Sequence, residues 1–167
     1  SGHFEMKTNK NTIIEAPVVA IAGGLGCFEP RKPTIVNIVD FEDRGVDYII
    51  KDPEKFRSKR IVIAGGGDSA LDWSIYLSDI AQEVVMIHRR TEFRGAPESV
   101  SKVGELVESG KIRLITEAEV TGLKGEHKLE SVEIQRTNQE PLILNTDYFI
   151  PLFGLTPKLG PIADWGL

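Results

Sequence analysis

A glycine-rich turn at residues 65–70 has the composition and spacing to bind the phosphates of a dinucleotide. In the pattern Gly65-x-Gly67-x-x-Ala70, Gly65 suits a tight turn and Gly67 lets a pyrophosphate approach the backbone. Ala70 is small enough for a following helix to pack closely, and the helix N-terminus favours an anion. Such a turn also occurs for packing alone, and an Asp in a first helical turn can act as a cap. The predicted phosphate-binding residues are Gly65, Gly66, Gly67, Asp68, Ser69 and Ala70.

A basic cluster at residues 88–94 has the charge to hold the extra phosphate of NADP(H). An NAD-binding unit would carry an Asp or Glu at the end of its second strand to accept the ribose hydroxyls, but this strand ends at His88. Guanidinium groups match phosphate geometry, so the cluster predicts a 2′-phosphate site; the alternative is a solvated run of charge. The predicted residues are His88, Arg89, Arg90 and Arg94.

A strand–turn–helix–strand unit must position these two groups. Residues 61–64 form a short apolar run rich in β-branched residues, which is typical of a strand buried on both faces. Apolar residues then recur at helical spacing from 70 to 80, and residues 83–87 form a second apolar run. The pattern therefore predicts two parallel strands joined by a helix, with both candidate groups at the carboxyl ends of the strands.

The rest of the chain extends this unit into an α/β fold. Residues 97–109 have a helical pattern, residues 112–115 predict a third parallel strand, and residues 147–152 predict another buried strand ending beside Gly154. Period-two segments at 119–123, 129–134 and 142–144 predict adjacent antiparallel strands. We expect a Rossmann-like parallel sheet with flanking helices and a three-stranded antiparallel meander covering one face.

The N-terminal part of the chain lacks the alternation of strands and helices that follows residue 60. Residues 4–8 and 12–15 predict a hairpin, and residues 18–22 predict a buried strand that runs into the glycines at 23–26. Two prolines close behind those glycines argue against a following helix, so a second nucleotide fingerprint is not favoured there. Residues 34–58 lack periodicity and are interpreted as a connecting segment.

Composition limits the possible classes of function. The net charge of −5 argues against a nucleic-acid or anionic-membrane surface, which makes the basic cluster a local feature. A single cysteine, Cys27, excludes an internal disulfide and a Cys-x-x-Cys metal or redox site within the chain. With no long apolar run, the sequence predicts a soluble, cytoplasmic protein. We assign no metal ligand and no general acid or base.

Together, four motifs resemble the NADPH domain of the thioredoxin-reductase-like ferredoxin–NADP reductases. They are Gly65-Gly66-Gly67-Asp68-Ser69-Ala70-Leu71-Asp72-Trp73, His88-Arg89-Arg90-x-x-Phe93-Arg94, Gly23-Gly24-x-Gly26-x-Phe28-x-Pro30 and Gly154-x-x-Pro157. The resemblance covers nearly the whole chain. It implies a homodimeric flavoenzyme that passes hydride from NADPH to FAD and then electrons to ferredoxin or flavodoxin.

The resemblance also implies roles and boundaries. Residues 1–45 would form the edge of an FAD domain and residues 46–167 the NADPH-binding domain, with Gly154 near the ribose or nicotinamide. Gly23, Gly24 and Phe28 would lie close to FAD. The family's two FAD-binding motifs would precede residue 1 and follow residue 167, so we expect a part of a longer enzyme. Gly95 departs from the family's usual alanine, which would loosen that turn.

The sequence leaves two alternative functions open. A thioredoxin reductase would carry a Cys-x-x-Cys pair at about residues 48–51, where this sequence has no sulfur. A non-enzymatic nucleotide-binding module or a methyltransferase would favour an acid at the end of the second strand, where this sequence has arginines.

Overall fold

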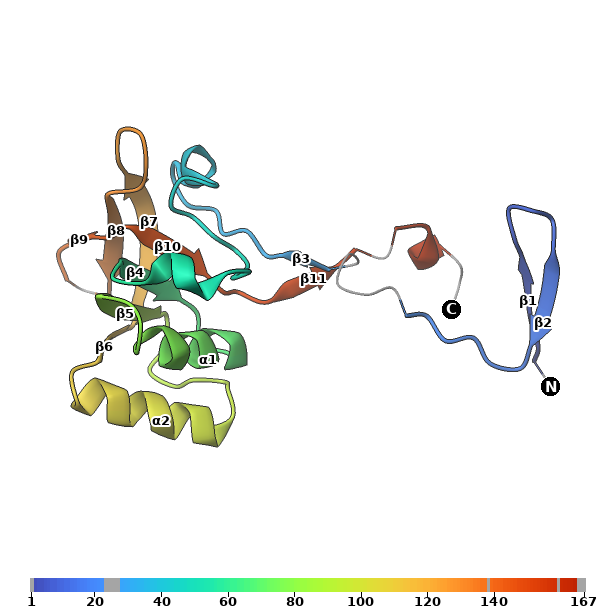
Figure 1. Ribbon diagram of the computed structural model, residues 1–167, viewed down its shortest axis with the longest axis horizontal. Helices are drawn as coiled ribbons and strands as arrows, with labels where there is room; N and C mark the ends of the chain where they lie inside the picture. Colours follow the sequence, from blue (N-terminus) through green and yellow to red (C-terminus); the bar gives the residue numbers. More distant parts are fainter. Residues whose placement is uncertain (1, 23–27, 138, 159, 165–167) are drawn as a thin grey trace. The chain divides into compact units, whose positions relative to one another are not determined.

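The computed structural model describes residues 2–22, 28–137, 139–158 and 160–164 (Figure 1). It divides into two compact units, which are described separately. The larger comprises Pro30–Thr156, and the smaller combines Ser1–Glu29 with Pro157–Leu167.

The larger unit is built on a four-stranded parallel sheet in the order β10-β4-β5-β6. Ala64, at the end of β4, pairs with Pro151 of β10 and Ile87 of β5, so the carboxyl ends of these strands meet at one edge. The predicted parallel strands and their order along the chain are confirmed. Their bounds are β4 Arg60–Ala64, β5 Glu83–His88, β6 Ile112–Thr116 and β10 Tyr148–Pro151.

Two helices cover one face of this sheet, as Figure 1 shows. They are α1 (Asp68–Leu77) and α2 (Pro97–Glu108), and α2 packs on α1 and β6. Alternate strand residues such as Ile63 and Met86 point to this side, where they pack with Leu71 and other fully buried side chains. The helices therefore cover one of the two apolar faces of the sheet.

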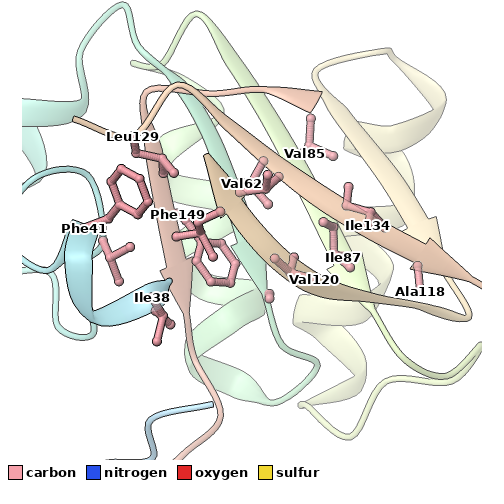
Figure 2. Packing of buried hydrophobic residues seen from close by; sticks show 14 of the residues in the cluster. Ile38, Phe41, Val62, Val85, Ile87, Ala118, Val120, Leu129, Ile134 and Phe149 are labelled. Carbon is pink, nitrogen blue, oxygen red and sulfur yellow. The ribbon is translucent and has the colours of Figure 1, made fainter. Parts of the chain in front are cut away.

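An antiparallel meander covers the opposite face. Its strands are β7 (Ala118–Lys124), β8 (Ser131–Arg136) and β9 (Leu142–Asn145), paired in that order. Figure 2 shows their side chains packed against the second set of alternate strand residues, including Val62, Val85 and Ile87. Because β4 and β5 are apolar on both faces, they can be covered by helices on one side and strands on the other. The predicted meander is confirmed.

The segment interpreted as a connection contributes to the core. Residues 34–58 contain two short 3-10 helices, Ile38–Phe41 and Pro53–Phe56. Ile38 and Phe41 pack beside Phe149 on the meander face (Figure 2), while Phe56 is fully buried on the helix side. Residues 34–58 belong to the larger compact unit, which begins at Pro30 and ends at Thr156. The assignment of FAD to residues 1–45 and of NADPH to residues 46–167 stays a prediction.

The smaller unit confirms one expectation and corrects another. The predicted hairpin is formed by β1 (Phe4–Lys7) and β2 (Ile13–Ala16). The predicted strand at 18–22 is wrong: these residues have no strand structure, and Val18 is 76% exposed. An apolar strand needs neighbours to satisfy its backbone groups, and the described residues offer it none.

The remaining elements are short. β3 (Phe28–Pro30) and β11 (Leu155–Pro157) pair with each other, and a 3-10 helix spans Gly160–Asp164. The predicted FAD-proximal residues Gly23 and Gly24 lie outside the described residues; Phe28 is exposed on β3. In the described part of the chain, no helix is long and apolar enough to cross a bilayer.

Candidate nucleotide-binding site

A cleft of about 570 Å³ opens at the carboxyl ends of the parallel strands. This is the edge at which open α/β sheets bind ligands, and the volume is within the range of small-molecule sites. The cleft brings together most of the residues singled out by the sequence. Those that line it are Gly65, Gly66, Gly67, His88, Arg89, Arg90, Arg94 and Gly154.

The first glycine stands where three elements converge. A Cβ placed on Gly65 would lie 2.7 Å from the Leu152 carbonyl oxygen and 2.8 Å from the Ala70 Cβ. Ala70 itself is fully buried. Helix α1 therefore begins very close to β4 and to the exit of β10, which is the close packing that the glycine–alanine spacing predicts.

The last glycine of the turn is open instead. A Cβ on Gly67 would meet nothing within 4 Å, and Gly67 precedes α1 in an extended conformation as its N-cap residue. The N–H groups of a first helical turn have no intrahelical acceptors, and the helix dipole adds positive potential there. The empty space beside Gly67 therefore fits a phosphate that approaches the backbone.

The three arginines supply the positive charge of the cleft. Arg89, Arg90 and Arg94 are exposed, and within the described part of the chain none of their guanidinium groups forms an ion pair or a side-chain hydrogen bond. Arg60 and Lys32, by contrast, are paired with carboxylates. The three cleft arginines can therefore donate hydrogen bonds to an anion.

His88 lines the cleft with little of its surface exposed. It is 8% exposed, its ring stacks on Phe93 with centroids 5.1 Å apart, and Nε2 lies 3.0 Å from the Glu92 carbonyl oxygen. Burial, reinforced by repulsion from the neighbouring arginines, lowers the pKa of His88 below its ordinary value. The charged imidazolium is thus disfavoured at this position, and the contact with Glu92 assigns Nε2–H as the donor.

Three of the predicted residues are not among those that line the cleft. The Asp68 carboxylate accepts a 2.7 Å hydrogen bond from the Ala96 N–H, at the start of α2. Ala70 is buried beneath the turn, and Ser69 is exposed on α1. The Asp68–Ala96 hydrogen bond therefore links the N-terminus of α1 to the N-terminus of α2. Direct phosphate contact by any of these three stays a prediction.

The close contact between the two helix N-termini also explains why residue 95 is a glycine. A Cβ at this position would overlap the Leu71 Cδ1 and lie 3.1 Å from the Asp68 carboxylate. Glycine therefore allows the segment after the arginines to lie directly on α1. This packing gives a reason for glycine at position 95, and the looser turn expected there stays a prediction.

The sequence did not predict one side of the cleft, which is formed by residues between 31 and 35 and by β7. Arg31, Thr34 and Ile35 line it, together with Glu119 of β7. The Arg31 N–H donates to the Gly154 carbonyl oxygen at 3.0 Å, and its Nε lies 3.2 Å from the Thr156 hydroxyl. These contacts join residues far apart in the chain, and no local spacing marks them.

The family of this chain follows from its similarity to known proteins. A family model described as pyridine nucleotide-disulphide oxidoreductase matches residues 1–167. The chain belongs to this family. A ferredoxin–NADP reductase from Flavobacterium johnsoniae is 63% identical to the chain, over 99% of this chain and 47% of the relative. Ferredoxin–NADP reductase 2 from Christiangramia forsetii is 62% identical over 99% of the chain and 48% of the relative.

A solved structure supports the predicted fold. Lactococcus lactis thioredoxin reductase, in its FR conformation, matches with a TM-score of 0.79 and 26% identity, over 98% of this chain and 53% of that one. The predicted resemblance and the fold class are therefore confirmed. The chain spans about half the length of the curated relatives it matches.

Proposed function

We propose that this chain is the NADPH-binding portion of a ferredoxin–NADP reductase. The observation that carries the proposal is the cleft in which an open glycine turn meets three arginines that have no ion-pair partner among the described residues. In the whole protein, NADPH would pass hydride to FAD, and electrons would continue to ferredoxin or flavodoxin. The protein residues would orient the nucleotide, because hydride transfer between these cofactors needs no side chain as proton donor.

The charges of the cleft favour NADP(H) over NAD(H). Arg89 and Arg90 directly follow β5, where an NAD-binding unit would hold a carboxylate. Among the described lining residues the one acid is Glu119, which belongs to β7 and not to the end of β5. Gly65, Gly66 and Gly67 would face the pyrophosphate, Arg89, Arg90 and Arg94 the 2′-phosphate, and Gly154 the ribose or nicotinamide.

The electron acceptor is proposed from the relatives' names and from the sulfur content. The relatives at 62–63% identity are called ferredoxin–NADP reductases. A thioredoxin reductase passes electrons through paired thiols, whereas residues 48–51 are Tyr-Ile-Ile-Lys and Cys27 is the single cysteine of the printed sequence. A protein carrier that takes electrons directly from flavin fits this chain better than thioredoxin does. A homodimeric state and a cytoplasmic location of the whole enzyme belong to the same proposal.

Titration of the purified chain with NADPH and NADH, followed by tryptophan fluorescence, tests the nucleotide assignment. We expect clear preference for NADPH; equal affinities would contradict it. The acceptor is tested with the full-length protein by measuring NADPH oxidation with ferredoxin, flavodoxin or thioredoxin. Rapid thioredoxin reduction with ferredoxin inert would favour the thioredoxin reductase alternative.

A further inference from the structure

The His88 side chain closes the loop that carries the first two arginines. Its Nε2 lies 3.0 Å from the carbonyl oxygen of Glu92, four residues along the chain, and its ring stacks on Phe93 at an interplanar angle of 18°. Both contacts are within the turn that follows β5. The imidazole therefore fixes the shape of the backbone between residues 88 and 93.

The same ring lies against the glycine turn. The three atoms nearest to a Cβ placed on Gly66 all belong to the His88 imidazole, and that Cβ would overlap the ring. The Gly66 carbonyl oxygen accepts a 2.8 Å hydrogen bond from the Arg94 N–H. The glycine turn and the arginine turn are thus docked on each other through Gly66, with His88 filling the space between them.

From these contacts we infer that His88 is a positioning residue, which sets the 2′-phosphate specificity through the arginine turn without binding the phosphate itself. The inference rests on the proposed function and revises the ligand role expected for His88. The ring is only 8% exposed, and its Nε2 is engaged by Glu92. The charged groups that act on it are Arg89, Arg90 and Arg94, and like charge disfavours an imidazolium beside them.

A double-mutant cycle tests the docking. Gly66→Ala should weaken NADPH binding by about tenfold because the added methyl displaces His88, and His88→Ala should have an effect of similar size. In the His88→Ala background the clash is gone, so Gly66→Ala should then cost less than about twofold. NADH affinity should change little in His88→Ala, because NADH has no 2′-phosphate. Equal costs of Gly66→Ala in both backgrounds would overturn the inference.

The conservative variant His88→Gln provides the matched control. Its side-chain amide keeps an N–H donor that can reach the Glu92 carbonyl, so we expect partial recovery of NADPH affinity relative to His88→Ala. Circular dichroism and thermal melting establish that each variant is folded. No recovery by Gln, in a folded variant, counts against the positioning role.

The pH profile of the unmodified chain distinguishes positioning from direct binding even if a variant fails to fold. For a neutral His88, the NADPH-to-NADH affinity ratio should rise as the 2′-phosphate ionises near about pH 6 and then stay level to about pH 8.5. A ratio that falls between about pH 6.5 and 7.5 would indicate an imidazolium on the phosphate and overturn the inference. Equal affinities for the two nucleotides at every pH would instead overturn the proposed function; a preference for NADPH with additive mutant effects overturns the role of His88 alone.

Discussion

The two ends of the parallel sheet use arginine in opposite ways. At the amino end, Arg60 opens β4 and is paired with Asp147, just before β10; Nη2 lies 2.9 Å from Oδ1, and the Arg60 N–H donates to Oδ2 at 2.9 Å. At the carboxyl end, Arg89 and Arg90 follow β5 with no carboxylate partner among the described residues.

The difference separates stability from binding. A guanidinium that is already paired has few free donors for a ligand, while an exposed guanidinium without a carboxylate partner can donate charge-assisted hydrogen bonds to an anion. Because every strand of a parallel sheet has the same direction, all of its open carboxyl-end loops gather at one edge. The amino end is therefore free to be closed by ion pairs without blocking the cleft.

The largest expected effect comes from removing the unpaired charges. Arg89→Ala with Arg90→Ala should weaken NADPH binding by roughly ten- to a thousandfold, since hydrogen bonds to charged groups contribute about 1.5–3 kcal/mol each before discounting for exposure. NADH binding should be nearly unchanged, and the melting temperature should stay constant because the side chains are exposed. Calorimetric titration measures both affinities. Equal losses for the two nucleotides would contradict a 2′-phosphate site.

A methyl group on the glycine turn should separate packing from ligand access. Gly67→Ala adds a Cβ where nothing lies within 4 Å, so it should cost less than about 1 kcal/mol of stability yet weaken both NADPH and NADH by about tenfold. Gly65→Ala is the matched control: its Cβ would lie 2.7 Å from the Leu152 carbonyl oxygen, so it should destabilise the fold by about 1–3 kcal/mol. Urea unfolding and nucleotide titration distinguish the two. A full nucleotide affinity in Gly67→Ala would show that the phosphates do not approach there.

Breaking the ion pair at the amino end of the sheet should lower stability and leave nucleotide binding unchanged. Asp147→Ala removes the bonds to both the Arg60 guanidinium and its backbone N–H, and we expect a loss of about 1–2 kcal/mol of stability after discounting for partial exposure. Nucleotide affinities should be unchanged. An NADPH affinity that falls along with the melting temperature would show that the two ends are coupled.

The smallest effect is the pH dependence of the same pair. Hydrogen bonds from Arg60 hold the pKa of Asp147 below its ordinary value. Its contribution to stability is therefore complete above the unfolded pKa of about 3.9 and is lost as the pH falls through the lower folded value. Urea unfolding from about pH 5 to about pH 3 should show a shallower decline for Asp147→Ala than for the unmodified chain. Parallel declines would exclude this carboxylate as a source of acid sensitivity.

The sequence alone determined the parts whose signals are local. The run at 61–64, the spacing from Gly65 to Ala70 and the basic cluster after residue 88 lie within single elements or short turns. The side-chain period and the glycine positions follow from the backbone geometry of those elements. The parallel strands, the two helices and the glycine and arginine parts of the cleft lining could therefore be predicted. The direction of parallel strands then brought the two turns to one edge.

Only the tertiary structure decided which side chains face the cleft and which support it. Asp68 and His88 belong to recognised motifs, but their contacts are with Ala96, Glu92 and Gly66. The partner of a hydrogen bond or of a close packing contact is set by the neighbouring element in the fold. The spacing of residues along the chain does not say which element that is.

Burial of the irregular segments was likewise decided in three dimensions. Ile38 and Phe41 follow no period, yet they cover the sheet beside Phe149, whereas Val18 continues an apolar run and stays exposed. An apolar side chain is buried only where another surface is available to receive it, and that surface is assembled from residues distant in the sequence.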